Sequence, residues 1–264
     1  MDLQLRGKRA LVTGSTGGIG LAIAVDLARE GAEVIVNGRT RERVDAALDR
    51  VRTEAPGARV DGVVADLAGA AGAGLITARF PELDILVNNV GIFRSVPFER
   101  IEDAQWILLF ETNVMSGVRL CRHYFPKMLK RNWGRILFIS SESALQIPAE
   151  MIHYGVTKTA QIALARGLSE LTVGTGVTVN TVLPGPTRSE GVETFVDELA
   201  RQGGKSPAEV EKEFFRSMRP SSLLQRFAEP AEVAHMVSFL ASPLASATNG
   251  AAVRVDGGVV RAIV

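Results

Sequence analysis

Three side chains that could move a proton lie close together in the middle of the sequence: Ser141, Tyr154 and Lys158. Residues 135–139 form a short apolar run typical of a strand, and from Ala160 the apolar residues recur at helical spacing. A helix that begins near Tyr154 would place Tyr154 and Lys158 one turn apart on one face. The nearby ammonium favours the phenolate, so we expect Lys158 to lower the pKa of Tyr154. Such a tyrosine can give or take a proton near neutral pH, which suits the polarisation of a carbonyl group.

The spacing Tyr-x-x-x-Lys is a weak signal when it is considered alone. A tyrosine and a lysine one turn apart also form ordinary amphipathic pairs on solvated helices. Ser141 strengthens the chemical interpretation, because it follows the predicted strand and can supply a hydroxyl to the same pocket. The elements elsewhere in the chain have to decide between the two interpretations.

A glycine-rich turn lies between a strand and a helix near the N-terminus. Residues 10–13 have the pattern of a buried strand, and the turn Gly-Ser-Thr-Gly-Gly-Ile-Gly leads from them into a helical pattern at Leu21. This layout aims backbone N–H groups and a helix N-terminus at a phosphate. Gly14 permits the tight turn, Gly18 lets the backbone approach a pyrophosphate, and Gly20 lets the helix pack against the strand. A glycine cluster can also be only a flexible loop, but the flanking strand and helix favour nucleotide binding.

The end of the second predicted strand, residues 33–36, indicates which dinucleotide would bind. A carboxylate at this place would hold the 2′-hydroxyl of NAD, whereas an arginine accommodates the 2′-phosphate of NADP. The sequence has Arg39 there and no carboxylate between Asn37 and Arg41. We therefore expect NADP, with NAD as the alternative, unless Arg39 is only an exposed surface arginine.

Strand-like and helix-like segments alternate through the rest of the chain. Further strands are predicted over residues 59–65, 84–87, 135–139, 176–182 and 251–255, and helices over 21–30, 41–53, 68–78, from 154 onward and over 229–240. Residues 101–130 are a long helical stretch in which a bend or a break stays open. The alternation predicts one doubly wound α/β domain over residues 1–264, with a mostly parallel sheet and helices on both faces. Residues 188–227 are more polar and contain Pro207 and Pro220, so we expect a lid over the site there.

Polar and glycine residues stand at the ends of the predicted strands. Ligands of doubly wound sheets bind beyond the carboxyl ends of the strands. One cleft should therefore collect the residues at those ends, which are Gly14, Arg39, Asp66, Asn88, Ser141 and Pro184.

The composition excludes several other classes of protein. The chain is 46% hydrophobic and 22% charged, and its 30 Lys and Arg residues balance 29 Asp and Glu residues, so charge gives no argument for nucleic acid binding. No apolar run is long enough for a membrane span, and no signal peptide is expected before the first strand. The single Cys121 cannot form an internal disulfide, which fits the cytoplasm, and its apolar surroundings predict a buried structural thiol. The three histidines show no zinc-site spacing, so no metal is expected.

These motifs, taken in order, resemble the short-chain dehydrogenase/reductase (SDR) family from about Gly7 to Val260. The turn from Thr13 to Gly20 is similar to the family's cofactor turn. The segment Asn88-Asn89-Val90-Gly91 is similar to its Asn-Asn-Ala-Gly segment, with valine in place of alanine. The matches to its catalytic tetrad are Asn113, Ser141, Tyr154 and Lys158, and those to two further segments are Pro184-Gly185 and Asp256-Gly257-Gly258.

The resemblance implies a Rossmann-type fold and a role for each matching residue. Tyr154 would donate or accept the proton, Ser141 would hydrogen-bond the substrate oxygen, and Lys158 would tune Tyr154 and hold the nicotinamide ribose. Asn113 would help to organise a water-linked proton relay. The cofactor would carry the hydride while the protein orients it. The resemblance also implies a homotetramer.

The resemblance also implies a set of cofactor contacts, with Asp66 near the adenine and Thr187 near the nicotinamide amide. Many NADP-using relatives carry a basic residue in the glycine turn, where this chain has Gly17, so Arg39 lacks that companion. The expected contacts are Gly14, Ser15, Thr16, Gly18, Ile19, Gly20, Arg39, Asp66, Leu67, Asn89, Gly91, Tyr154, Lys158, Pro184, Gly185 and Thr187.

The expected function is hydride transfer between NADP(H) and a carbonyl or alcohol substrate. Two alternatives stay open: a non-catalytic dinucleotide sensor on the same fold, which would not need the full tetrad, and an epimerase or dehydratase, whose chains usually have an added domain. The substrate is undefined, and a 3-oxoacyl chain, a steroid-like ketone and a sugar all remain compatible. We expect apolar pocket walls from Leu145, Ile147, Met151 and Ile152, while Glu142 and Glu150 either meet polar substrate groups or face solvent.

Overall fold

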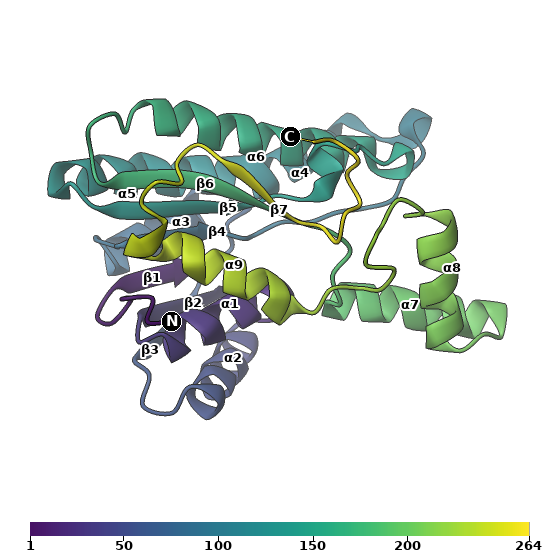
Figure 1. The fold of residues 1–264 in the computed structure, drawn as a ribbon, viewed down its shortest axis with the longest axis horizontal. Coiled ribbons are helices and arrows are strands. Elements are labelled where there is room, and N and C mark those ends of the chain that lie inside the picture. The colour runs from purple at the N-terminus through teal and green to yellow at the C-terminus, as the bar shows by residue number, and fades with distance from the viewer. Residues whose placement is uncertain (264) are drawn as a thin grey trace.

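A single sheet of seven parallel strands forms the centre of the protein (Figure 1). The computed structural model describes residues 1–263, without the side chains of residues 190, 194, 195, 198 and 202. The strands are β1 (Arg9–Val12), β2 (Glu33–Gly38), β3 (Val60–Val64), β4 (Ile85–Asn88), β5 (Gly134–Ile139), β6 (Val177–Pro184) and β7 (Ala252–Val255). Their order is β3-β2-β1-β4-β5-β6-β7, so the direction of winding reverses between β1 and β4. The predicted doubly wound α/β fold is confirmed, and the sheet is parallel throughout its described strands.

Helices cover both faces of the sheet. The described helices, of which α7 and α8 lie outside these two layers, are α1 (Gly18–Arg29), α2 (Arg41–Glu54), α3 (Ala70–Arg79), α4 (Asp103–Phe110), α5 (Ser116–Arg131), α6 (Ile152–Glu170), α7 (Glu190–Gly203), α8 (Pro207–Ser217) and α9 (Pro230–Ala241).

Strand β1 shows how the two faces are filled. Ala10 and Val12 pack in one core with residues of α1, α2 and α9, whereas Leu11 points to the opposite core with residues of α3, α5 and α6. Successive side chains of a strand alternate between faces, so a strand covered on both sides is apolar throughout. This explains why the strands read as continuous apolar runs.

The long helical stretch predicted over residues 101–130 is divided. Helix α4 passes through a five-residue π turn, Glu111–Met115, before α5 begins. A π turn widens the helix locally and re-aims its side chains, and such turns often occur at functional sites. Asn113 lies in this turn.

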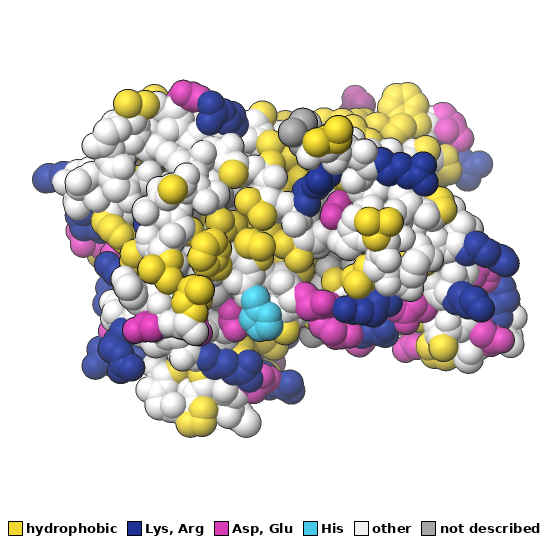
Figure 2. Space-filling view, viewed as in Figure 1, with side chains coloured by type: hydrophobic (Ala, Val, Ile, Leu, Met, Phe, Trp, Pro, Cys, Tyr) yellow, Lys and Arg dark blue, Asp and Glu magenta, His cyan; other side chains and the backbone are white. Residues whose placement is uncertain are grey.

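Helices α7 and α8 project from one end of the molecule, away from both helical layers (Figure 1). They enclose a small apolar cluster of their own, whose buried members are Val196, Ala200, Val210, Phe215 and Phe227. Figure 2 shows that acidic and basic side chains gather at this end, whereas apolar side chains cross the middle of the same face. The segment falls within the region for which we predict a lid.

Among the described residues, no helix has the length and apolar character needed to cross a membrane.

Candidate active site

Tyr154 and Lys158 lie in the first turns of α6, as the spacing predicts. The Lys158 Nζ atom is 5.6 Å from the centroid of the Tyr154 ring. Lys158 is buried, and its ammonium donates to the Ile139 carbonyl at the end of β5, 2.9 Å away. In return, the Ser140 hydroxyl donates to the Lys158 carbonyl at 2.8 Å. These two bonds fix the helix start against the strand end.

The predicted effect of Lys158 on Tyr154 is wrong for the protein without ligands. Burial raises the pKa of Tyr154, and the negative charge of Glu142 raises it further, against the lowering effects of Ser141 and Arg219. Burial also lowers the pKa of Lys158 to about 7. The prediction considered one neighbouring charge and left out the cost of removing both groups from water.

Asn113 connects the π turn to the loop after β4 and to α6. Its amide donates to the Ile92 carbonyl and to the Thr157 hydroxyl, both at 2.9 Å, and its side-chain oxygen accepts from the Ile92 N–H at 2.8 Å. Asn113 is therefore a buried structural link and not a solvent-facing residue.

Gln161 is a member of this group that the sequence interpretation missed. Its Nε2 donates to the Asn113 backbone carbonyl at 2.6 Å, and its Oε1 accepts from Lys158 Nζ at 3.3 Å. The Gln161 side chain is buried. It lies three residues after Lys158, a helical spacing that brings side chains together, so the spacing could have identified it.

Ser141 follows β5 and shares its hydroxyl with an unexpected partner. Its Oγ donates to Glu142 Oε2 at 2.5 Å and accepts from the Ser143 N–H at 3.1 Å. Glu142 is buried, and its other oxygen accepts from Arg219 Nε at 3.1 Å. Arg219 comes from the chain after α8, so the predicted lid region contributes a charge to the surroundings of Ser141.

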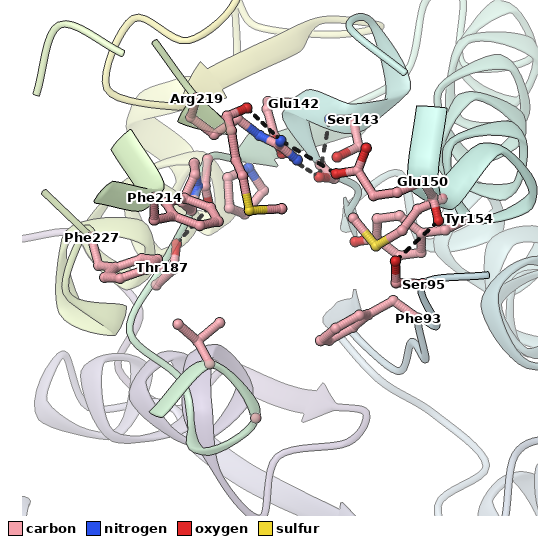
Figure 3. A pocket seen from close by; sticks show the side chains of 18 of the residues that line it. Phe93, Ser95, Glu142, Ser143, Glu150, Tyr154, Thr187, Phe214, Arg219 and Phe227 are labelled. Atoms are coloured by element: carbon pink, nitrogen blue, oxygen red, sulfur yellow. Dashed lines mark hydrogen bonds and ion pairs between the residues drawn. The ribbon is translucent and has the colours of Figure 1, made fainter. Parts of the chain in front are cut away.

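A pocket of about 280 Å³ opens beside these groups (Figure 3). Figure 3 shows Arg219, Glu142 and Glu150 along one edge, with Phe214 and Phe227 on one side. Further lining residues are Phe93, Ser95, Ser141, Ser143, Met151, Tyr154, Pro184, Gly185, Thr187 and Met218.

Three of the four predicted apolar wall residues are misplaced. Leu145 and Ile147 are 47% and 46% exposed, and neither they nor Ile152 lines the pocket, while Met151 does. Of the two environments left open for Glu150, the structure shows the pocket, where the Glu150 carboxylate lies 3.7 Å from Arg219.

A longer cleft of about 750 Å³ runs across the carboxyl ends of β1 to β4, where the winding reverses. Doubly wound sheets bind dinucleotides at such a reversal. The pocket and the cleft share Ile19 and Gly191, so they adjoin. The predicted cofactor residues that line the cleft are Gly14, Thr16, Gly18, Ile19, Arg39, Asp66, Leu67, Asn89 and Gly91.

The glycine turn fits a phosphate by its backbone. Gly14 and Gly18 have φ angles of +60° and +53°, which favour glycine, and Gly18 lines the cleft at the start of α1. No side chain caps α1 and no acidic residue lies in its first turn, in the part of the chain that the structure describes. The N–H groups of this helix end therefore remain available to an anion.

Other predicted cofactor residues lie behind the cleft or in the pocket. Ser15 is fully buried, and its Oγ donates to the Val12 carbonyl at 2.7 Å, so it braces the turn. Gly20 also lies behind the surface, because a Cβ there would lie 2.4 Å from Asn89 Nδ2. The predicted residues that line the pocket are Tyr154, Pro184, Gly185 and Thr187.

Two arginines line the cleft at the end of β2. Arg39 was predicted, whereas Arg43 in the first turn of α2 was not. No carboxylate stands among residues 37–41. The place where a 2′-substituent of the adenine ribose would lie is thus cationic, which fits a phosphate better than a hydroxyl.

The described residues contain no group of His, Cys, Asp and Glu side chains that could hold a metal ion. Cys121 is buried, and burial raises its pKa to about 12, in agreement with a structural thiol.

Comparison with known proteins agrees with this geometry. The family model described as short chain dehydrogenase matches residues 8–200. The uncharacterized oxidoreductase YvaG of Bacillus subtilis is 49% identical, and the match covers 100% of both chains. The 3-oxoacyl-acyl-carrier-protein reductase FabG of Aquifex aeolicus is 33% identical over 98% of this chain and 100% of its own.

The crystal structure of L-sorbose reductase from Gluconobacter frateurii, in complex with NADPH and L-sorbose, covers 100% of both chains with a TM-score of 0.93 and 31% identity. The matching sequence family, the full-length relatives and the shared fold lead to one assignment. The chain belongs to the short-chain dehydrogenase/reductase family of NAD(P)-dependent oxidoreductases.

Proposed function

We propose that the protein reduces ketones with NADPH and that Tyr154 is the general acid. The observation that carries this proposal is the position of Tyr154 and Ser141 in the wall of the pocket, which shares Ile19 and Gly191 with the cleft, while Lys158 Nζ lies 5.6 Å from the centroid of the Tyr154 ring. The nicotinamide cofactor, when it is bound, supplies the hydride. The protein's own residues then have to orient the carbonyl and deliver a proton to its oxygen.

The ionisation of the two buried groups suits this direction. The Tyr154 phenol carries its proton at neutral pH, as an acid must, but burial and Glu142 raise its pKa, so the phenolate that forms needs a positive charge beside it. Lys158, whose pKa burial lowers to about 7, is balanced between its charged and neutral forms. We infer that Lys158 stabilises the phenolate that forms when Tyr154 gives up its proton, and that Asn113 holds the π turn beside them.

Arg39 and Arg43 support a preference for NADPH over NADH. A guanidinium can pair with a phosphate through two charge-assisted hydrogen bonds. Hydrogen bonds to charged groups contribute roughly 1.5–3 kcal/mol, which corresponds to about a ten- to hundredfold preference. The relatives add support, because the L-sorbose reductase structure contains NADPH. Residual use of NADH fits the exposed position of both arginines.

A spectrophotometric assay tests the proposal. The protein is incubated with NADPH and a panel of ketones, and the loss of NADPH absorbance is followed. A reductase oxidises NADPH only when a ketone is present. If the protein binds NADPH tightly but does not oxidise it in the presence of any ketone of the panel, it would instead be the non-catalytic sensor.

The relatives differ in the substrates that their names state. FabG of A. aeolicus is a 3-oxoacyl-acyl-carrier-protein reductase, whereas the G. frateurii enzyme reduces L-sorbose. The pocket in this chain, at about 280 Å³, is small and carries a buried Glu142–Arg219 pair. We infer a compact ketone with a polar end, and 3-oxoacyl thioesters belong in the panel as the alternative.

We also infer that the protein acts as a homo-oligomer in the cytoplasm, with a tetramer as the expected form. Helix α4 exposes Ile107, Leu108 and Phe110 to 63%, 50% and 40%. An exposed apolar group of this kind marks an interaction surface. Light scattering coupled to size-exclusion chromatography tests the proposal, and a monomer at micromolar concentration would contradict it.

A further inference from the structure

We propose that the pocket selects neutral ketones that carry a hydroxyl group on the carbon next to the carbonyl. This inference rests on the proposed ketone reduction and adds the chemical class of the substrate. Its origin is the buried group formed by Ser141, Glu142 and Arg219, to which the sequence motifs assign no role beyond that of Ser141. In Figure 3, Glu142 and Arg219 border the pocket on the same edge as Glu150, and Ser141 also lines this pocket.

The first step concerns a shared proton. A serine hydroxyl has one proton to donate. In the protein, Ser141 gives this proton to Glu142 Oε2 at 2.5 Å and accepts from the Ser143 N–H at 3.1 Å. If Ser141 is to hydrogen-bond a substrate carbonyl, its proton has to leave Glu142.

The second step is the consequence for Glu142. Glu142 is 4% exposed, so water does not readily replace a lost partner of its carboxylate. Arg219 Nε holds the other oxygen, Oε1, at 3.1 Å, and Arg219 itself is 9% exposed. When Ser141 turns to the carbonyl, Oε2 is therefore a buried, charged acceptor without a donor, and leaving such an atom unpaired is costly.

A substrate hydroxyl can restore the lost hydrogen bond. A carbonyl oxygen that accepts from Ser141 lies about 2.7–2.8 Å from the Ser141 Oγ. Glu142 Oε2 lies 2.5 Å from that same Oγ, so both oxygens are neighbours of one atom. A hydroxyl on the carbon next to the carbonyl lies between the carbonyl oxygen and Glu142 Oε2, and it can donate a hydrogen bond to Oε2. A ketone with a methyl group in that place cannot.

The charged side chains along this edge of the pocket favour a neutral ligand over an anionic one. Glu142 and Glu150 lie 3.1 Å and 3.7 Å from Arg219, so two carboxylates face a single guanidinium. Arg219 Nη1 is further occupied by the Met218 carbonyl at 2.9 Å. A substrate carboxylate would meet net negative charge in a largely buried place, which is unfavourable.

The test compares ketones of equal size. We would measure kcat/KM with NADPH for 3-hydroxy-2-butanone and 3-methyl-2-butanone, and for 2-hydroxycyclohexanone and 2-methylcyclohexanone. The hydroxy ketone of each pair is expected to be preferred by about ten- to hundredfold, the value for a donor that satisfies a buried charged acceptor. In the Glu142→Gln variant most of this preference should be lost, while Glu170→Gln, on the exposed end of α6, should retain it.

A binding measurement covers the case in which Glu142→Gln does not fold. Calorimetric titration of the wild-type protein with NADP⁺ should show tighter binding of 2,3-butanediol than of 3-methyl-2-butanol. Equal kcat/KM values within the pairs, or equal binding of the two alcohols, would overturn the inference and leave ketone reduction standing. The absence of NADPH oxidation with every ketone would contradict the proposed function itself.

Discussion

Replacement of Gln161 by methionine should move the pH dependence of the reaction toward acid. Gln161 Oε1 accepts a hydrogen bond from Lys158 Nζ, and an acceptor of this kind stabilises the charged form of the lysine. Burial already lowers the pKa of Lys158 to about 7. Methionine fills similar space without an acceptor, so the pKa of Lys158 should fall further.

The size of the shift follows from the strength of that bond. A hydrogen bond to a charged group contributes roughly 1.5–3 kcal/mol, and one pKa unit corresponds to about 1.36 kcal/mol. The Nζ–Oε1 distance of 3.3 Å is long for such a bond, which places the effect at the lower end. We expect a shift of about one pKa unit, and both groups are buried, so solvent does not screen it away.

The assay is kcat/KM for NADPH measured across the neutral and alkaline range. The ammonium is present below the pKa of Lys158 and lost above it, so the alkaline limb should move to lower pH in Gln161→Met. Gln161→Glu is the matched variant, because it keeps an acceptor and adds a negative charge that favours the ammonium, and its limb should move to higher pH. Both variants lose the donor to the Asn113 carbonyl. Limbs that stay in place, or move in the same direction, would refute the reasoning.

Three further predictions concern the cofactor and the turn that holds it. Arg39→Leu should raise the NADPH dissociation constant about tenfold and leave that for NADH nearly unchanged, as titration with both cofactors would show; equal losses would make Arg39 structural. Lys158→Ala should reduce both turnover and NADPH affinity, and a loss of turnover alone would argue against its contact with the ribose. Gly20→Ala should lower stability by about 1–3 kcal/mol in thermal unfolding, because its Cβ would lie 2.4 Å from Asn89 Nδ2 and 2.5 Å from the Gly14 carbonyl. Gly167→Ala is the control, since nothing lies within 4 Å of its Cβ, and it should be neutral or slightly stabilising.

The fold was predictable because its signals are local. The conformation of apolar runs such as residues 135–139, and of glycines such as Gly14, can be predicted from the local sequence without any information about distant contacts. The same holds for Tyr154 and Lys158, because their spacing of four residues places both side chains on one face once a helix forms there. The sequence allowed for a bend or break within residues 101–130, but the position of the π turn was not predictable in this way, because the turn is stabilised by long-range bonds from Ile92 and Gln161.

Residues of the site could be predicted only where they belong to a recognisable sequence motif. Glu142 and Arg219 are 77 residues apart, and no periodicity relates them. Arg43 contacts the cleft because α2 starts directly after β2, which follows from the fold and not from the spacing. Leu145 and Ile147 show the opposite error, since hydrophobic character alone does not say whether a loop residue points toward the pocket.

The most direct test of the central claim is the Tyr154→Phe variant, which removes the phenolic hydroxyl and keeps the ring. Turnover of a hydroxy ketone should fall by about 10²–10⁴-fold, the range for loss of a general acid. NADPH binding, followed by the fluorescence of the bound cofactor, should remain as in the wild type. Reduction at near wild-type rates in this variant would contradict the assignment of Tyr154 as the proton donor.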